Sequence, residues 1–325
     1  MVSALSLASK AQDTIKTTSD APLIISGSVD AYYKYDFSGH NNIPTYYGNE
    51  QNSFSIGMVD LGLKKKVGKA LFVGELSFGP RSDASLPVPT NHIENLYVSY
   101  DVTDSFNLTG GYMATFIGYE VIAPTGNFNY STSYLFSAGP FQNAGFKATY
   151  TFSPSASLMV GAFNDQWNVY TSAGRINTLG AQLMLVPVKN WTAYLNLATG
   201  PASGTIFDLT TNYQMTDAFK LGVNAATKSG NGAPNYSGVA IYPQLAVCKT
   251  VTLGLRGEYF DVKAVGTTPS SSVTALTFTA NIKSGPLTFM PEIRFDNGST
   301  NIFTDSNKAP TKSATQFLVA AVYAF

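Results

Sequence analysis

The chain ends in QFLVAAVYAF (316–325), where side chains of two kinds alternate. Every second residue from Phe317 belongs to a bulky series that ends in the aromatics Tyr323 and Phe325, and the other series is smaller. Because successive side chains of a β-strand point to opposite faces, this ending predicts a strand with one bulky apolar face. Two settings suit such a strand: the core of a soluble β-sandwich, or a membrane barrel with Tyr323 and Phe325 in an aromatic girdle.

The same alternation recurs along most of the chain. In IISGSVDAYYKYDF (24–37), the odd-numbered residues are uncharged, whereas the even-numbered face carries Asp30, Lys34 and Asp36. Charged residues make up only 12% of the chain, about half of the ~25% usual in soluble domains. The chain has no apolar run of ~18 residues that could form a transmembrane helix. This combination favours a membrane β-barrel, in which only every second residue of a strand must be apolar.

Sixteen segments alternate in this way, and the connections between them alternate in length. Tight turns such as KKVGK, FSPSA and KSGP are followed by longer connections, a rhythm typical of outer-membrane meanders with short periplasmic turns and longer external loops. We therefore predict an all-β fold, namely a closed antiparallel up-and-down transmembrane β-barrel of 16 strands, with 14 or 18 strands as alternatives. The predicted strands are 23–37, 53–65, 69–79, 93–102, 105–116, 141–152, 155–165, 177–187, 190–199, 204–214, 218–228, 236–247, 250–262, 272–283, 286–297 and 313–325.

Three of these strands contain irregularities. Pro243 and Pro291 fall inside the strands 236–247 and 286–297, where each proline removes a donor from the hydrogen-bond ladder. In strand 53–65, Phe54, Ile56 and Met58 share one parity, whereas Val59, Leu61 and Leu63 share the other. We expect bulges to shift the register of these strands.

The chain divides into residues 1–21, which resemble a truncated signal peptide with a flexible tail as the alternative, and a barrel over residues 22–325. The formal net charge is zero, which argues against nucleic acid as a partner. Cys248 is the only cysteine, so disulfide frameworks and cysteine-based metal sites are excluded. We expect no cofactor, no metal and no catalytic residues. The expected partners are outer-membrane lipid, small polar solutes, and a further copy of the chain or an outer-membrane complex.

The longest connection, residues 117–140, is rich in aromatic residues and has a single charge, Glu120. An aromatic loop of this kind gains by packing, and the barrel interior is the nearest surface for it. We expect the loop to fold inward and narrow the lumen, with packing on a neighbouring subunit or on other loops as the alternative. The predicted constriction residues are Tyr119, Glu120, Phe128, Tyr130 and Tyr134.

Along each predicted strand, polar residues alternate with apolar ones, and these polar residues are expected to face the lumen. Because both signs of charge occur among them, we expect weak ion selectivity; the alternative is that they pair with each other across strands. An Arg or Lys facing lipid at mid-depth would cost ~2–4 kcal/mol, which favours the inner face. The predicted lumen-lining residues are Asp30, Lys34, Glu75, Lys147, Arg256, Glu258, Glu292 and Arg294.

Three segments between 111 and 150 carry a resemblance to a known family: GYMATFIGYE (111–120), NFNYSTSYL (127–135) and GPFQNAGFKATY (139–150). They resemble the β-barrel porin-2 (OmpL-like) family of outer-membrane porins, and FSIGM (54–58) and the terminal strand fit it too. Members often have Arg after the Ser of NYS and a His after GPF, where this chain has Thr132 and Gln142-Asn143. These departures leave ion preference open.

These observations predict a porin of the bacterial outer membrane that lets small polar solutes diffuse passively through a loop-narrowed aqueous lumen. The alternative is a non-conducting barrel, plugged by its own loop, that serves as a scaffold or accessory subunit of an outer-membrane complex. An enzyme would depend on His40 or His92, which both lie in predicted external loops, and the chain has no G-x-S-x-G or H-E-x-x-H motif.

Overall fold

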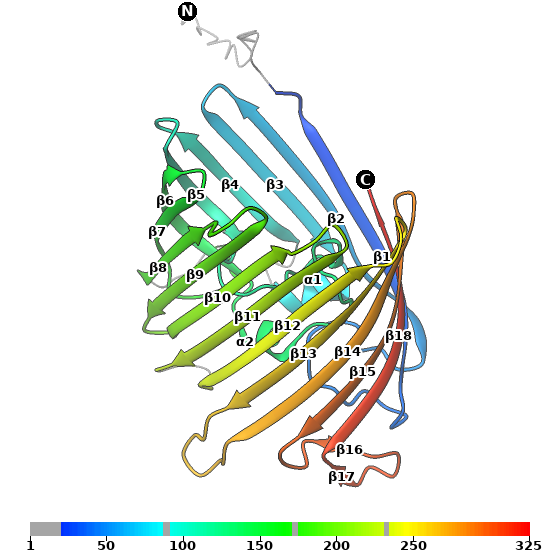
Figure 1. Ribbon diagram of the computed structural model, residues 1–325. Coiled ribbons are helices and arrows are strands. Elements are labelled where there is room, and N and C mark those ends of the chain that lie inside the picture. Colours follow the sequence, from blue (N-terminus) through cyan, green and yellow to red (C-terminus); the bar gives the residue numbers. More distant parts are fainter. Residues whose placement is uncertain (1–20, 87–91, 171–174, 231–233) are drawn as a thin grey trace, which may run out of the picture.

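The computed structural model of the protein describes residues 21–86, 92–170, 175–230 and 234–325. The signal-like segment predicted at 1–21 therefore lies outside the described residues, except for Ala21. In the described part, sixteen antiparallel strands close into a barrel (Figure 1), as predicted. The barrel strands are β1 (Ile24–Asp36), β2 (Ser53–Val67), β3 (Ala70–Phe78), β4 (Ile93–Asp101), β5 (Phe106–Ala114), β6 (Gln142–Ser153), β7 (Ala156–Asn164), β8 (Ile176–Leu185), β9 (Trp191–Gly200), β10 (Gly204–Gln214), β11 (Phe219–Ser229), β12 (Tyr236–Ala246), β13 (Val251–Val262), β14 (Ser271–Ser284), β15 (Leu287–Gly298) and β18 (Ser313–Ala324).

The remaining elements lie in the long connections. Helix α1 (Pro80–Ser85) follows β3, and the turn η1 (Pro124–Gly126) and helix α2 (Tyr134–Ala138) lie between β5 and β6. A two-stranded hairpin, β16 (Phe303–Thr304) with β17 (Pro310–Thr311), lies between β15 and β18. None of the helices in the described residues is long and apolar enough to cross a membrane.

The first and last strands seal the ring. β1 pairs with β18 from Ser28 opposite Ala324 to Asp36 opposite Gln316. The last residue extends this ladder, because Phe325 donates to the carbonyl of Gly27 at 3.0 Å and accepts from its N–H at 3.1 Å. A Cβ at Gly27 would lie 2.8 Å from the Phe325 ring, so glycine makes room for that ring. Closure leaves no unpaired edge, which lipid could not hydrogen-bond.

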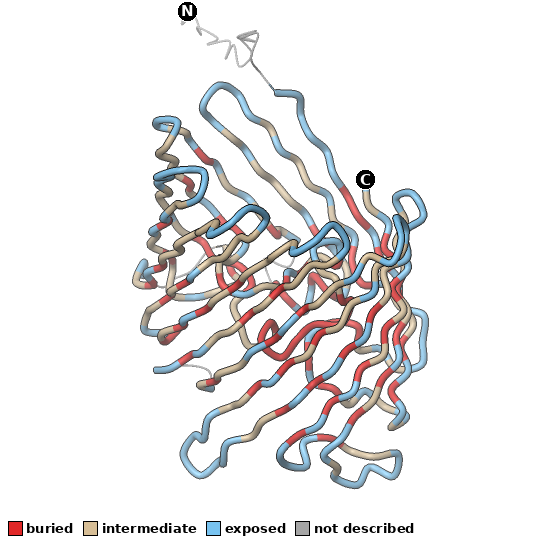
Figure 2. Tube along the Cα trace, viewed as in Figure 1, coloured by how far each residue is buried: buried red, intermediate tan, exposed pale blue. Residues whose placement is uncertain are grey.

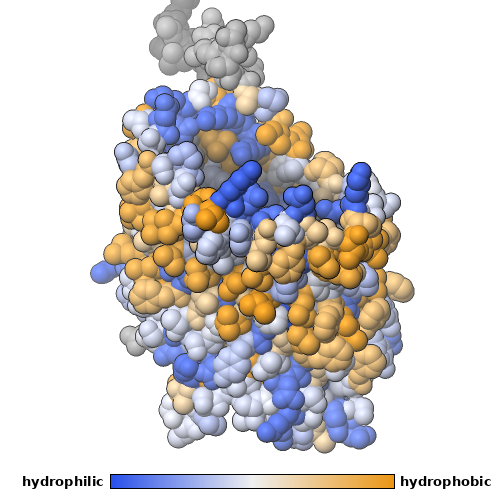
Figure 3. Space-filling model, in the orientation of Figure 1, coloured by the Kyte–Doolittle hydropathy of each residue, from blue (hydrophilic) through white to orange (hydrophobic). Residues whose placement is uncertain are grey.

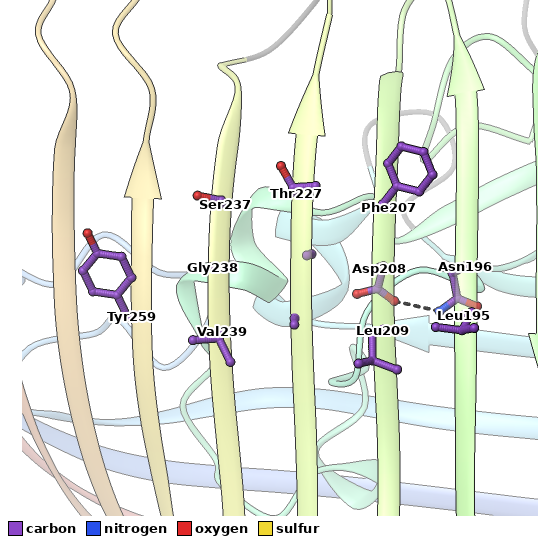
Figure 4. Close-up of a pocket in the computed structure, with 12 residues that line it drawn as sticks. Leu195, Asn196, Phe207, Asp208, Leu209, Thr227, Ser237, Gly238, Val239 and Tyr259 are labelled. Atoms are coloured by element: carbon purple, nitrogen blue, oxygen red, sulfur yellow. Dashed lines mark hydrogen bonds between the residues drawn. The ribbon is translucent and has the colours of Figure 1, made fainter. Parts of the chain in front are cut away.

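The outer face of the barrel is apolar. Figure 3 shows hydrophobic residues gathered over the side of the barrel, with a polar hollow at the end that carries the short turns. Side chains alternate as predicted: Phe207 is exposed on the outer face, whereas its neighbour Asp208 is buried on the inner face and accepts a hydrogen bond of 2.7 Å from Asn196. A groove of about 690 Å³ lies on the outer face near Phe207 and Tyr259 (Figure 4). It faces lipid and is therefore no candidate for a solute site.

The predicted irregularities have different outcomes. In β2, the register against β1 shifts between Val29 and Ala31, and Met58 is buried while Ile56 and Val59 are exposed, so the predicted bulge is confirmed. The two prolines cause no shift of register. Residue pairing on the β13 side of β12 skips Pro243, and pairing on the β14 side of β15 skips Pro291, but both ladders continue in the same register. Each proline therefore interrupts the pairing with only one of the two neighbouring strands.

Candidate functional site

The connection between β5 and β6 (residues 115–141, hereafter the β5–β6 loop) folds into the barrel. Figure 1 shows its helix α2 enclosed by the ring of strands, and Figure 2 shows buried segments of this loop inside the barrel. Its side chains join several apolar clusters: Tyr130 packs with Leu318 of β18, and Ile117 packs with Ala198 and Ile206 of β9 and β10. The loop is thus held against the inner wall over many strands.

Two carboxylates of the wall hold the loop backbone. Glu292 of β15 accepts hydrogen bonds from the N–H groups of Tyr130 at 3.0 Å and Ser131 at 3.3 Å. Glu258 of β13 accepts from the first two N–H groups of α2, at 3.0 and 2.8 Å. Because the first N–H groups of a helix have no partner within the helix, Glu258 caps α2 from the wall. Both carboxylates are buried, and a buried charge needs such donors.

A positively charged side chain of the wall, Arg256 of β13, also binds this loop. It forms an ion pair of 2.9 Å with Glu120, in which 0% and 4% of the two side chains are exposed. The guanidinium also donates to the carbonyl of Ser131 at 2.5 Å. Glu120 accepts further hydrogen bonds from the N–H of Ser133 at 2.7 Å and the hydroxyl of Tyr242 at 3.2 Å. Because breaking a buried ion pair costs ~3–5 kcal/mol, this pair fixes the loop strongly.

A second arginine of the wall, Arg294 of β15, also donates to the loop. Its guanidinium pairs with Asp296 at 2.8 Å and donates to the carbonyl of Thr132 at 2.9 Å. It also lies 5.2 Å from the ring centre of Tyr134, whose hydroxyl donates to Asp296 at 2.7 Å. The wall therefore offers acceptors to the N–H groups of the loop and donors to its carbonyls, so that the buried loop backbone finds partners that water would otherwise provide.

Arg81 was not among the predicted residues, yet it joins three loops. It lies in α1, is buried, and donates to the carbonyls of Ile122 and Tyr130 at 3.0 Å each. Its guanidinium also lies 4.4 Å from the ring centre of Tyr47, in the β1–β2 connection, and 4.6 Å from that of Tyr130. Such cation–π contacts strengthen when desolvated. The only signal in the sequence is that Arg81 is the single Lys or Arg of residues 79–92.

Glycines on the wall make room for side chains of the loop. A Cβ at Gly254 would lie 2.1 Å from the ring of Phe128, and a Cβ at Gly222 would lie 2.1 Å from the hydroxyl of Tyr119. Neither position can carry a larger residue while the loop stays where it is, so the wall and the loop are shaped to each other. The same relation holds for Gly180 with Phe116 and for Gly238 with Leu135.

The eight predicted lumen residues all lie on the inner face, but loops cover most of them. Glu75 of β3 and Lys147 of β6 are half-buried. The covered residues are Asp30, Lys34, Arg256, Glu258, Glu292 and Arg294. Asp30 accepts from the hydroxyl of Tyr130, and Lys34 donates to Asn41 at 2.6 Å. Most of the predicted charges therefore bind loops and do not face open water.

The five predicted loop residues lie at different places on the wall. Tyr119 stacks on Tyr242 with ring centres 4.4 Å apart and donates to Asn212 at 2.6 Å. Burial, together with the nearby charge of Glu120, raises the pKa of Tyr119 to about 12. Burial also raises the pKa of Tyr130 and of Tyr134. These hydroxyls therefore remain protonated at neutral pH and act as donors. Phe128 is half-buried over Gly254.

The two histidines have separate partners. His40 contacts the hydroxyl of Thr304 at 2.6 Å, and the ring of His92 stacks on Phe78 with centres 4.6 Å apart. Within the described residues, no group of three or more His, Cys, Asp or Glu side chains has the geometry to hold a metal ion. Neither histidine lies among the residues that bind the β5–β6 loop.

A closed 16-stranded antiparallel barrel with an apolar outer face and a loop packed inside it is the architecture of an outer-membrane porin. The chain belongs to the family described as "Putative beta-barrel porin-2, OmpL-like", whose model matches residues 22–325. It is therefore a porin of the bacterial outer membrane, for passive diffusion. Its family and fold are those of a channel rather than an enzyme. A search of curated proteins found no match.

Solved structures share the fold at low sequence identity. The anion-selective porin from Comamonas acidovorans is 13% identical, with a TM-score of 0.64 over 94% of this chain and 99% of that one. Salmonella typhi OmpF in complex with daunomycin is 12% identical, with a TM-score of 0.65 over 93% and 97%. The outer membrane channel DcaP of Acinetobacter baumannii is 13% identical, with a TM-score of 0.62 over 95% and 99%. At these identities the likeness concerns the fold alone.

Proposed function

We propose that this porin passes small polar solutes through a lumen narrowed by the β5–β6 loop, and that the open passage runs along the wall opposite the loop's charged anchors, β3 to β6. The observation that carries this proposal is the concentration of these charged anchors on one wall. Its charged anchors Arg256, Glu258, Glu292 and Arg294 lie on β13 and β15, and further polar contacts reach Asp30 of β1, Asp208 and Asn212 of β10 and Gln182 of β8. On the other wall, Glu75 and Lys147 keep part of their surface exposed.

The charge of this passage follows from which side chains the loop covers. Arg256 and Arg294 are paired with Glu120 and Asp296, and the loop covers Glu258 and Glu292, so these four side chains do not line the open passage. Of the eight predicted lumen charges, Glu75 and Lys147 keep exposed surface, one of each sign, and we expect weak ion selectivity from them. Exchanging Lys147 for Glu should make the pore prefer cations, which reversal potentials across a salt gradient would measure.

The decisive experiment is conductance of the purified, folded protein in planar bilayers. Stepwise insertions with a defined conductance support the proposal, and silence over many insertions contradicts it. A variant in which residues 117–138 are replaced by a short glycine–serine linker separates the loop from the barrel. The proposal expects a higher conductance for this variant than for the wild type.

A non-conducting, plugged barrel is the second candidate, because apolar clusters extend from loop to loop inside the barrel. One cluster joins Tyr47, Leu86 and Phe136 of three different connections. Another joins Ile43 and Phe303 to Tyr242 of the wall. In this case the wild type would be silent in bilayers, and the variant lacking residues 117–138 would conduct.

Self-association is a further part of the proposal. OmpT of Vibrio cholerae, a structural neighbour with a TM-score of 0.57, has been solved in a trimer form. In this chain, Phe54 and Ile56 on the outer side of β2 are among the most exposed apolar residues, and exposed apolar surface suits a contact with another subunit. Light scattering on the detergent-solubilised protein would give the number of subunits, and a monomer would contradict this part.

A further inference from the structure

A small cavity of about 210 Å³ lies between the tip of the β5–β6 loop and the inner wall of the barrel, near the short turn that joins β14 to β15. Residues of β14, β15 and β18 form its wall side, and the turn η1 with the residue that follows it forms its loop side. We call it the tip cavity. It is smaller than the ~300–1,000 Å³ of sites that bind drug-sized ligands, so it suits an ion or a very small molecule.

Two hydrogen-bond donors stand side by side on the wall of this cavity. Lys283 of β14 and Thr288 of β15 both line it and are directly opposite each other in the sheet. The Cβ atoms of such a pair are ~4.5–5.5 Å apart on the same face. That face is the inner one, because Asn281, two residues before Lys283, donates to the carbonyl of Phe128 in the loop at 3.2 Å. One bound group can therefore accept hydrogen bonds from both side chains.

A third donor comes from the loop. Thr125 of η1 lines the tip cavity on its loop side. The loop tip is held in place, because the side chain of Asn127 accepts from the N–H of Val121 at 2.9 Å and donates to its carbonyl at 2.7 Å. Tyr130 of the same loop packs in one cluster with Met290, which also lines the cavity. Donors thus face the cavity from two surfaces that are already fixed, which reduces the entropy lost on binding.

The three donors are accessible and have no other partner. Lys283 and Thr125 are exposed, and Thr288 is half-buried. Within the described part of the chain, Lys283 belongs to no ion pair, and none of the three side chains forms a hydrogen bond. Among the described residues that line the tip cavity, none is acidic. A ligand that arrives from solution therefore meets one free cation and two free hydroxyl groups.

The charges around the tip cavity favour an anion. Figure 3 shows hydrophilic residues around a hollow at the end with the short turns. Within the described residues, the alternation of the strands places Lys64, Lys66, Lys220 and Lys283 on the inner face near these turns, against a single carboxylate, Asp101. Asp101 is already paired with Lys66 at 2.8 Å. Because a hollow lined by one sign of charge raises the local concentration of counter-ions, anions gather at this end of the lumen.

We propose that the tip cavity binds a free tetrahedral oxyanion of the phosphate or sulfate type. Lys283 supplies the charge, Thr288 donates from the wall, and Thr125 donates from the loop. A carboxylate has two oxygens in one plane, whereas a tetrahedral oxyanion has oxygens on all sides and can accept from the wall and the loop together. The bound anion then links the loop tip to the wall. This binding does not depend on conduction, so it can be tested even if the barrel is silent in bilayers.

The test measures the binding of inorganic phosphate to the folded full-length barrel in a non-ionic detergent, by the broadening of the phosphorus NMR line. Excess NaCl is present, because salt screens diffuse attraction to the lysines. We expect saturable binding that sulfate displaces more strongly than acetate does. Lys283→Met should weaken it by about tenfold or more, the loss expected for a charge-assisted hydrogen bond. Thr288→Val, which keeps the shape of the side chain without its hydroxyl, should weaken it by a smaller factor.

Lys220→Met is the matched control, because it also removes an inner-face lysine near the short turns but lies on β11, outside the tip cavity. It should leave the dissociation constant of phosphate unchanged. The variant that lacks residues 117–138 has no Thr125 and should lose the site, and heat-modifiable mobility on gels reports whether each variant has folded. Binding that does not saturate, or an equal loss in Lys283→Met and Lys220→Met, would overturn the proposal, because either result means diffuse attraction only.

Discussion

Replacing Arg256 by Met tests how the β5–β6 loop is held. Arg256 is fully buried, pairs with Glu120 at 2.9 Å, and donates to the carbonyl of Ser131 at 2.5 Å. Met keeps part of the side-chain volume but leaves Glu120 buried without its cation, which costs ~3–5 kcal/mol. At 1.4 kcal/mol for each factor of ten, the ratio of docked to detached loop falls by roughly 100-fold to 4,000-fold.

The assay is single-channel conductance in planar bilayers. We expect Arg256→Met to show a higher or flickering conductance, because a detached loop uncovers the lumen. In the double variant Arg256→Met with Glu120→Gln, the conductance should return part of the way to the wild-type value, since this variant has no uncompensated charge on Glu120. Lys66→Met is the control, because it also breaks an ion pair, with Asp101 at 2.8 Å, but that pair is exposed to solvent and lies away from the loop. A folded Arg256→Met barrel with wild-type conductance would refute the reasoning.

Three further predictions concern the same loop. Gly254→Leu should raise the conductance in planar bilayers, because a Cβ there would lie 2.1 Å from Phe128 and the loop must move. Gly257→Ala on the same strand is the control: a Cβ there has its nearest atom at 3.5 Å, so this variant should conduct as the wild type does. Arg81→Met should increase proteolytic cleavage of the β5–β6 loop in the folded barrel, since three connections lose their shared cation; an unchanged cleavage rate would show that the other anchors suffice. Loop docking should be complete below pH ~10, the ordinary pKa of tyrosine, and should weaken as pH rises toward the pKa of about 12 of Tyr119, because the detached loop loses its proton more easily; conductance that stays flat up to pH ~12 would contradict this.

The barrel itself follows from local pattern. An alternation as regular as that of residues 24–37 places every charge on one face, and a one-residue slip would expose those charges to lipid. The bulge in β2 could be predicted for the same reason. Ile56 and Val59 have even and odd residue numbers, yet both apolar side chains must face outward. The prolines were harder to interpret, since a missing donor on one side of a strand leaves the register unchanged.

The site could be predicted only in part, because its contacts join residues that are far apart in the chain. Parity places Arg256 and Glu292 on the inner face, but it does not say whether water or a loop covers them. Arg81 carries no local pattern, and its role depends on carbonyls 41 and 49 residues away. Gly254 resembles any strand glycine until the ring of Phe128 is seen against it. Such complementarity is a property of the folded interior and not of a sequence window.

The most direct test of the central claim is liposome swelling with uncharged sugars of increasing size, using wild type and the variant that lacks residues 117–138. We predict that wild-type liposomes admit the smallest sugars only, and that the size limit rises when the loop is removed. If the two proteins admit the same sugars at the same rates, the loop does not narrow the lumen and the account fails.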